Sequence, residues 1–299
     1  MTNLAEISNG LADVVAGAGA GVVRVAGRRR MAASGIVWTA DGLIATADHV
    51  VPKRHQPKIG LPDGSVVAAT IVGRDPTTDI AILQVGASDL TVAPRGAADT
   101  LRVGQLVTAV ARPRNSVQAT LGMVSATAGE WRTHMGGHMA HFIRTDVLMY
   151  PGFSGGPLVN AAGEIVAMNS SALHRGESLA ISNATIQRVA DALVKHGRVK
   201  RGYLGVKTQV VRLPQDVAEE LSQETGLLIV SVASESPAAE SGLIVGDIIV
   251  TFDGHKTTHS DELIAALTGV DTEQKTPAHV VRGGVAQDIM VKVGEKSGK

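Results

Sequence analysis

The segment Pro151-Gly152-Phe153-Ser154-Gly155-Gly156-Pro157-Leu158-Val159 places a serine in a tight turn that is rich in glycine. A serine hydroxyl is a poor nucleophile unless a base removes its proton, and backbone N–H groups beside it must be able to stabilise an oxyanion. Glycines on both sides allow such a turn and the close approach of a substrate. The segment therefore indicates a nucleophilic Ser154, against the alternative of a glycine-rich β-turn with an idle serine.

Two upstream segments supply candidates for a base and for a carboxylate that orients the base. His49 follows an apolar run at the end of a predicted strand, and Asp79 precedes the apolar run Ile80–Val85. Taken alone, either residue could be structural, because aspartate is common in turns and caps. Together with Ser154 they give the chain order His, Asp, Ser, which is the order of chymotrypsin-type barrels. The sequence therefore predicts a catalytic triad.

A second interpretation of the same turn is the nucleophile elbow of α/β-hydrolases. That fold requires a helix after the serine, with the acid and the histidine further along the chain. Here Pro157 and an alternating apolar run follow, which indicate a strand, while Asp191 and His196 both fall on one predicted helix. The pattern therefore disfavours the hydrolase elbow.

Short β-like runs separated by turn residues fill the part of the chain before residue 170. They cover residues 22–25, 34–38, 43–46, 66–72, 80–85, 106–110, 118–124, 141–145, 158–159 and 165–168. Many short strands with regular turns are typical of antiparallel barrels or sandwiches. Apolar residues at helical spacing predict helices over residues 3–16 and 184–196.

A polar, basic stretch at residues 195–201 marks a domain boundary, so we predict one domain over residues 1–197 and another over 198–299. In the second part, five predicted strands accompany a helix over residues 261–267. The strands cover residues 205–211, 226–231, 247–252, 278–282 and 288–293. This pattern is typical of a small α/β module.

Composition argues against several classes of function. The 299 residues carry a formal net charge of zero, whereas nucleic-acid binders show a basic excess or a basic face. The cluster Arg28-Arg29-Arg30 is interpreted as a solvated turn, so we expect no nucleic-acid partner. The absence of cysteine excludes disulfides, thiolate metal sites and a cysteine nucleophile.

The sequence shows neither a targeting segment nor a membrane span. Residues 1–25 lack a basic region followed by an apolar one, and no run approaches the roughly 20 apolar residues of a membrane helix. We therefore expect a cytoplasmic location for the chain as given, or a periplasmic or other extracytoplasmic location if the chain is truncated.

Three histidines, His134, His138 and His141, share a loop that contains glycine. On a helix they would lie on one face and could bind zinc, but Gly136 and Gly137 argue against a helix. We expect no metal site. A pH response of this loop through its imidazoles is the alternative.

The stretches 33–51, 74–85, 122–127 and 143–169 resemble those of HtrA-type (high-temperature-requirement A) serine proteases, a family with the chymotrypsin fold. The run into the nucleophile, Arg144-Thr145-Asp146-Val147-Leu148-Met149-Tyr150-Pro151-Gly152, is especially close. The resemblance implies a mainly β fold of two six-stranded antiparallel β-barrels followed by a small α/β PDZ domain. It also implies a serine endopeptidase of protein quality control and stress response, which acts on unfolded or damaged proteins as a homotrimer without a cofactor.

The resemblance assigns roles to individual residues. It places the triad at His49, Asp79 and Ser154, and it places the oxyanion hole at the backbone N–H groups of Gly152 and Ser154, with Phe153 in the same loop.

The resemblance also assigns a specificity pocket, at Leu148, Leu179 and Ala180. Leu148, six residues before the nucleophile, would form an apolar floor that favours small aliphatic side chains before the scissile bond. The segment Leu179-Ala180-Ile181-Ser182 departs from the family pattern, which usually begins with an aromatic residue and ends with proline. Asp48 is a second departure, because the family often has asparagine there.

Residues 202–299 resemble a PDZ domain. The matching pieces are Arg201-Gly202-Tyr203-Leu204-Gly205-Val206, Ser236-Pro237-Ala238-Ala239, Gly242-Leu243 and Gly246-Asp247-Ile248-Ile249. Tyr203, Leu204, Gly205 and Val206 would form a turn whose N–H groups bind the terminal carboxylate of a peptide, which adds as a strand beside residues 205–211. A generic glycine turn before a strand is the plainer alternative. For the whole chain, the rival function is a peptide-binding or chaperone protein that does not cleave, built on a protease-like scaffold.

Overall fold

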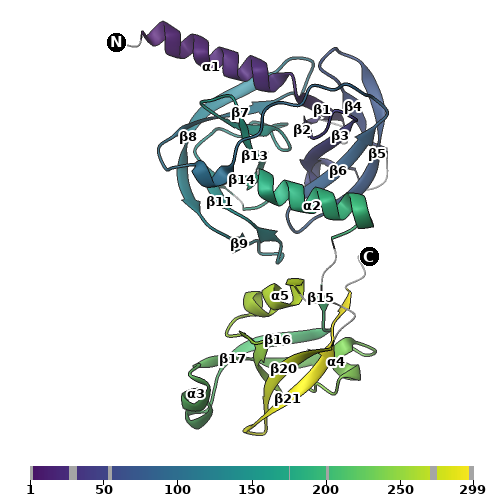
Figure 1. Cartoon of the computed structure of the whole chain (residues 1–299), viewed down its shortest axis with the longest axis vertical. Helices are drawn as coiled ribbons and strands as arrows, with labels where there is room; N and C mark the ends of the chain where they lie inside the picture. Colours follow the sequence, from purple (N-terminus) through teal and green to yellow (C-terminus); the bar gives the residue numbers. More distant parts are fainter. Residues whose placement is uncertain are drawn as a thin grey trace. The chain divides into compact units, whose positions relative to one another are not determined.

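The computed structural model describes residues 3–26, 32–52, 56–174, 176–199, 202–269 and 275–295, without the side chains of residues 268 and 269. The chain divides into two compact units, Met1–Val199 and Lys200–Lys299, close to the predicted boundary at residue 197. The cluster Arg28-Arg29-Arg30 lies outside the described residues. The elements of each unit are labelled in Figure 1.

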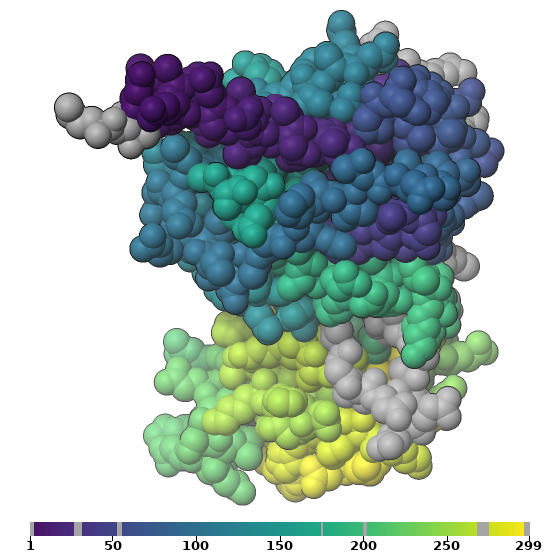
Figure 2. All heavy atoms as spheres, turned by 45° about the horizontal axis from the view of Figure 1, so that its top comes forward, coloured from purple at the N-terminus to yellow at the C-terminus, as the bar shows by residue number. Residues whose placement is uncertain are grey.

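Helix α1 (Leu4–Gly19) begins the first unit at a capping box, in which Asn3 accepts from a backbone N–H while Glu6 accepts from the N–H of Asn3. Such reciprocal bonds satisfy N–H groups that a helix start otherwise leaves unpaired. Only Ala18 and Gly19 of α1 are buried, and the helix lies along the surface of the unit (Figure 2). The predicted helix over residues 3–16 is therefore present, three residues longer at its end.

The first barrel closes six antiparallel strands in the order β1-β2-β3-β6-β5-β4. They are β1 (Val22–Ala26), β2 (Ala33–Val37), β3 (Leu43–Ala47), β4 (Lys58–Gly60), β5 (Val66–Asp75) and β6 (Ile80–Val85). Valine, isoleucine and alanine fill its interior, as expected where β-branched side chains pack on a pleated surface. A single 3₁₀ turn, Asp48–Val50, follows β3 and carries His49.

The second barrel has the strand order β11-β14-β13-β12-β7-β8. Its strands are β7 (Leu106–Ala111), β8 (Gln118–Ala128), β11 (Phe142–Thr145), β12 (Pro157–Asn160), β13 (Ile165–Ser170) and β14 (Ser178–Ser182). A 3₁₀ turn at Ala98–Thr100 precedes it, and a hairpin of β9 (Trp131–Arg132) and β10 (His138–Met139) extends from it. The expectation of two six-stranded antiparallel barrels is confirmed.

Helix α2 (Asn183–His196) closes the first unit on the predicted segment. Ser182 caps its start, and Gly197 ends it in the left-handed conformation at φ 68°, which glycine adopts without steric cost. Its buried face, which includes Ile186, Val189 and Leu193, joins the largest apolar cluster of the unit.

The second unit is a sheet in the order β16-β17-β18-β20-β21, with β19 paired to β18 and a separate pair of β15 and β22. Its strands are β15 (Gly202–Tyr203), β16 (Val206–Arg212), β17 (Thr225–Val232), β18 (Ile248–Phe252), β19 (His255–Lys256), β20 (Lys275–Arg282), β21 (Val285–Lys292) and β22 (Gly294–Glu295). Its helices are α3 (Gln215–Leu221), α4 (Pro237–Glu240) and α5 (Ser260–Gly269). Sequence reasoning anticipated α5 but neither α3 nor α4, which are too short to show a helical period.

A buried ion pair ties two parts of this sheet together. The carboxylate of Asp247 is fully buried, and it accepts from the Arg282 guanidinium at 2.6 and 2.7 Å and from the Ile244 N–H at 2.9 Å. Burial alone would raise the pKa of Asp247, but these hydrogen bonds and the Arg282 charge outweigh burial and hold the pKa below its usual value.

This pair predicts how the second unit loses stability in acid. A depressed folded-state pKa gives stability that is complete above the unfolded-state value of about 3.9 and is lost as pH falls through the folded-state pKa. We expect Asp247→Ala to lower the free energy of unfolding by about 2–3 kcal/mol, less than for a pair with both partners buried, because Arg282 reaches water. Urea unfolding of the full chain at neutral pH measures the loss, and the acid dependence should flatten in the variant.

The matched control is Asp288→Ala, which removes an exposed carboxylate that pairs with His279 at 2.7 Å in the same unit. Exposed pairs contribute about 1 kcal/mol or less. Equal losses for the two variants would contradict a special role of the buried pair.

Candidate active site

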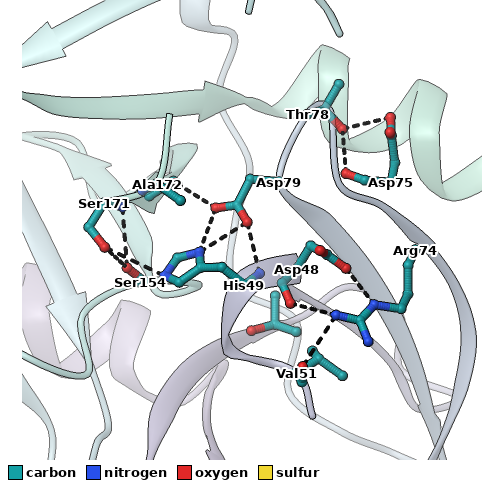
Figure 3. Close-up of polar contacts among 12 residues, drawn as sticks. Asp48, His49, Val51, Arg74, Asp75, Thr78, Asp79, Ser154, Ser171 and Ala172 are labelled. Carbon is teal, nitrogen blue, oxygen red and sulfur yellow. Dashed lines mark hydrogen bonds and ion pairs between the residues drawn. The ribbon is translucent and has the colours of Figure 1, made fainter. Parts of the chain in front are cut away.

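His49 is held at the mouth of the first barrel by the carboxylate predicted to orient it. Its Nδ1 lies 2.8 Å from Asp79 Oδ2 and 3.0 Å from Oδ1, and its backbone N–H donates to Oδ1 at 2.9 Å. The ring lies between the Asp79 carboxylate and the hydroxyls of Ser154 and Ser171 (Figure 3). An ionised carboxylate can only accept, so Nδ1 carries the proton and Nε2 is left as the basic nitrogen.

Asp79 occupies an unusual backbone conformation between β5 and β6. Its φ is 56°, in the left-handed region where aspartate is one of the few tolerated residues besides glycine. Its carboxylate is buried and also accepts from Ser170 Oγ at 2.5 Å, while its carbonyl accepts from the Asp48 N–H at 3.0 Å. Four donated bonds therefore fix this carboxylate and the histidine turn together.

The loop before Asp79 is organised by a second buried aspartate. Asp75 accepts from the N–H of Thr77 at 3.1 Å and from the hydroxyls of Thr77 and Thr78, each at 2.8 Å. This is the local bonding typical of an Asx turn. The β9–β10 hairpin contacts the same loop, because Thr133 Oγ1 donates to the Thr77 carbonyl at 2.7 Å.

Asp48 pairs with Arg74 beside the histidine turn. Arg74 Nε lies 2.5 Å from Asp48 Oδ1, and the same guanidinium donates to the carbonyls of Asp48 at 2.9 Å and Val51 at 3.2 Å. Arg74 therefore holds the 3₁₀ turn that carries His49. The aspartate at residue 48, where the family often has asparagine, supplies the carboxylate that pairs with this guanidinium.

Ser154 lies in the turn that the sequence predicts, and glycine is required on both sides. Gly152 has φ 97° and Gly155 has φ 84°, and a Cβ on Gly155 would lie 2.2 Å from the carbonyl oxygen of Ser34. Phe153 is fully buried, so it anchors the turn in the second barrel.

Two N–H groups of this turn are left unpaired among the residues that the structure describes. They belong to Gly152 and Ser154, whereas Phe153 N–H donates to Tyr150 at 3.1 Å and the Phe153 carbonyl accepts from Gly156 at 3.0 Å. Both unpaired groups belong to residues that line a cavity of about 350 Å³, which His49 also lines. The arrangement can hold a negatively charged oxygen beside the Ser154 hydroxyl.

A second hydroxyl, which sequence reasoning missed, lies next to the Ser154 hydroxyl. Ser171 Oγ is 2.9 Å from Ser154 Oγ and 3.5 Å from His49 Nε2, and Ser171 N–H lies 3.3 Å from Ser154 Oγ. Ser170, also missed, donates to Asp79. Ser170 is the last residue of β13 and Ser171 follows it, so only the strand register reveals which side chain reaches the site.

The specificity residues are not gathered around this cavity. Leu148 is 57% exposed, while Leu179 and Ala180 are buried within the second barrel. Met149 and Tyr150 line the cavity that Ser154 shares. Neighbouring side chains on an extended segment point to opposite sides. Met149 therefore faces the cavity, while Leu148, one residue earlier, faces solvent.

The three loop histidines lie on or beside the β9–β10 hairpin and not on a helix. His138 pairs with Glu130 at 3.2 Å, His134 lines a cavity with His49, and His141 gives its carbonyl to the Trp131 indole at 3.1 Å. Within the described ranges, no group of three or more His, Asp or Glu side chains is placed to hold a metal ion.

Comparison with known proteins defines the class of this chain. Residues 33–168 match the family model of the trypsin-like peptidase domain, and residues 202–293 match that of the PDZ domain. The chain resembles the "HtrA-type protease AlgW with decapeptide" at 27% identity, with a TM-score of 0.80 over 96% of this chain and 99% of that one. It resembles the serine endoprotease from Yersinia pestis at 29% identity, with a TM-score of 0.79 over 96% and 98%.

Curated proteins are similar to most of this chain. A protein of Marinomonas sp. (strain MWYL1), named "Probable periplasmic serine endoprotease DegP-like", is 38% identical over 277 residues, which are 89% of this chain and 57% of that protein. A relative of the same name from Pseudomonas fulva (strain 12-X) is 37% identical over 279 residues, 90% of this chain and 57% of that protein. The chain therefore combines a trypsin-like peptidase domain with a PDZ domain, and it is similar to HtrA-type proteases over 96% of its length. It spans a little over half the length of these relatives.

The relatives correct one expectation. We expected a cytoplasmic location from residues 1–25, but the relatives are named as periplasmic proteins, so that expectation is wrong. Targeting segments are removed from mature proteins, so the lack of a targeting pattern does not decide the compartment. Separately, none of the helices in the described part of the chain is long and apolar enough to cross a membrane.

Proposed function

We propose that this chain is a serine endopeptidase that cleaves proteins through His49, Asp79 and Ser154. The observation that carries the proposal is the His49 ring, with Nδ1 2.8 Å from the Asp79 carboxylate and Nε2 turned toward the serine hydroxyls (Figure 3). In that orientation the basic nitrogen faces the group whose proton it would take.

In the proposed reaction, Ser154 Oγ attacks the scissile carbonyl carbon while its proton passes to His49 Nε2. The oxygen of the tetrahedral intermediate accepts from the N–H groups of Gly152 and Ser154. His49 then gives the proton to the leaving amine, and water repeats the sequence on the acyl-enzyme. Asp79 holds the Nδ1–H of the ring throughout and stays ionised.

The proposed substrates are unfolded or damaged proteins outside the cytoplasm. The periplasmic, DegP-like names of the relatives support this assignment. A substrate must present an extended segment to the cavity beside Ser154, and unfolded chains offer such segments freely. A homotrimeric assembly remains a prediction from the family resemblance.

We propose that the PDZ unit regulates cleavage by binding peptide C-termini. Gly205 has φ 84°, the carbonyls of Leu204 and Gly205 accept from Ala238 and Ala233, and the N–H groups of Leu204 and Gly205 have no acceptor among the described residues. Strand β16, which follows, ends the order of its sheet, and α5 packs against it. A free strand edge beside unpaired N–H groups suits an added peptide strand with a terminal carboxylate.

One experiment tests both parts of this proposal. A fluorophosphonate probe should label Ser154 covalently in the full chain, and mass spectrometry should map the adduct to that residue. The labelling rate should rise when a peptide with a free C-terminal carboxylate is added, and it should not rise with the amidated form of the same peptide.

The outcomes separate the rival functions. No labelling at any pH, with or without peptide, would favour a peptide-binding or chaperone protein that does not cleave. Labelling that both peptides change equally, or that neither changes, would retain the peptidase and contradict carboxylate-dependent regulation.

A further inference from the structure

A buried serine of the first barrel contacts the nucleophile turn of the second barrel. Ser34, on β2, is fully buried. Its hydroxyl donates to the Gly152 carbonyl at 2.8 Å, and its backbone N–H donates to the Ser154 carbonyl at 3.2 Å. One residue therefore binds the carbonyls on both sides of Phe153.

The direction of the Ser34 hydroxyl bond is fixed by a second donor. The backbone N–H of Arg112 donates to Ser34 Oγ at 2.8 Å, so a lone pair of that oxygen is occupied and its hydrogen is directed to the Gly152 carbonyl. The Ser34 carbonyl accepts in turn from Thr46 Oγ1 at 2.7 Å. The N–H, carbonyl and hydroxyl groups of Ser34 are therefore all hydrogen-bonded.

Arg112 itself is held by carbonyls and not by a carboxylate. Its guanidinium donates to Gly19 at 2.8 Å, to Val22 at 2.7 Å and to Asn115 at 2.9 Å. Gly19 is the last residue of α1, where a cation complements the negative end of the helix dipole. Burial lowers the pKa of Arg112 from its usual value, yet an arginine stays charged in proteins. Arg112, whose N–H orients the Ser34 hydroxyl, is therefore held in place by its own side chain.

The consequence appears in the backbone of the nucleophile turn. Of the six N–H and carbonyl groups of Gly152, Phe153 and Ser154, four are paired, and Ser34 pairs two of these four. The two that remain are the N–H groups that face the developing oxyanion in the proposed reaction. The Gly152 carbonyl shares its peptide plane with the Phe153 N–H, and the Ser154 carbonyl shares its plane with the Gly155 N–H, so Ser34 pins the two planes on either side of the plane that carries the Ser154 N–H. The pinned plane at the Gly152 carbonyl also adjoins the plane that carries the Gly152 N–H. Pinning these neighbours limits rotation of the two donors, and oxyanion stabilisation depends on donors that are placed before the reaction.

We propose that Ser34 is a positioning residue of the oxyanion hole: it holds the Gly152 and Ser154 carbonyls so that the N–H groups of these residues stay available to the substrate. Ser34 does not touch substrate and takes no part in proton transfer. The proposal rests on the proposed peptidase activity, and it places a determinant of the rate in the barrel that does not carry the nucleophile.

The test compares Ser34→Ala with Thr46→Val in the full chain, using a peptide substrate and amide hydrogen exchange of residues 150–156. Thr46→Val removes an equally buried hydroxyl bond, which joins β3 to β2 and does not reach Gly152. We expect Ser34→Ala to lower kcat by about 10–10²-fold, short of the 10²–10³-fold for deleting a donor, with little change in KM. We expect Thr46→Val to stay within about threefold of the original kcat.

Exchange of the turn amides should rise in Ser34→Ala and not in Thr46→Val. If Ser34→Ala does not fold, Ser34→Cys replaces it, since a thiol keeps only a weak donor, and we expect it to lower kcat and to speed exchange of the turn amides relative to the original chain. Unchanged kcat and unchanged exchange in Ser34→Ala, or equal losses in Thr46→Val, would overturn the proposal. If the unmodified chain proves inactive toward the fluorophosphonate probe, the peptidase assignment fails, while the exchange comparison still decides whether Ser34 holds the turn.

Discussion

Replacing Ser154 with alanine is expected to lower kcat by about 10⁴–10⁶-fold, the scale seen when a triad member is removed. The alanine keeps the turn, because Gly152 and Gly155 supply its left-handed conformations, and it keeps the unpaired N–H groups. The loss therefore isolates the nucleophile from the oxyanion hole. Casein digestion, with the cleavage sites mapped by mass spectrometry, measures the difference and also reports the cleavage preference.

The matched control for this prediction is Ser88→Ala, since Ser88 is exposed and bonds only Asp89 among the described residues. The Ser88→Ala variant should digest casein at the rate of the unmodified chain. Substantial digestion by Ser154→Ala, beyond the small residual rate that binding and the oxyanion hole alone provide, would mean that another group of the chain attacks the peptide bond.

The turn around Ser154 and the barrels could be predicted from the sequence because each depends on local patterns. Glycines around Ser154 specify a turn whatever surrounds it, and alternating apolar residues specify strands of a barrel wall. His49 and Asp79 could be paired only through chain order and family resemblance. The structure then places His49 in the turn after β3 and Asp79 immediately before β6, and these are neighbouring strands of one barrel.

The supporting contacts could not be predicted, because they depend on register between distant strands. The Ser34–Gly152 bond spans 118 residues of the chain and the Ser170–Asp79 bond spans 91. A slip of one residue turns a side chain to the opposite face of its strand. The same sensitivity separates exposed Leu148 from Met149, which lines the cavity. Sequence spacing alone does not resolve differences of this size.

The second large effect is expected for Asp79→Asn, which should lower kcat by about 10⁴-fold near neutral pH. An amide can donate to Nδ1 where the carboxylate could only accept, so the ring would adopt the tautomer with its proton on Nε2. That nitrogen could then no longer take the Ser154 proton. The same variant should react slowly with the fluorophosphonate probe, because both reactions need an activated hydroxyl.

A matched variant separates an effect on the His49 tautomer from an effect on the folded structure. Asp89→Asn makes the same substitution at a left-handed residue, φ 59° against 56° at Asp79, and asparagine is favoured in this region as aspartate is. Asp89→Asn should keep full activity, and both variants should unfold at similar temperatures. If Asp79→Asn retained a tenth or more of the original kcat, the carboxylate would not be what directs the His49 ring, and the base in this chain would have to be sought in another side chain.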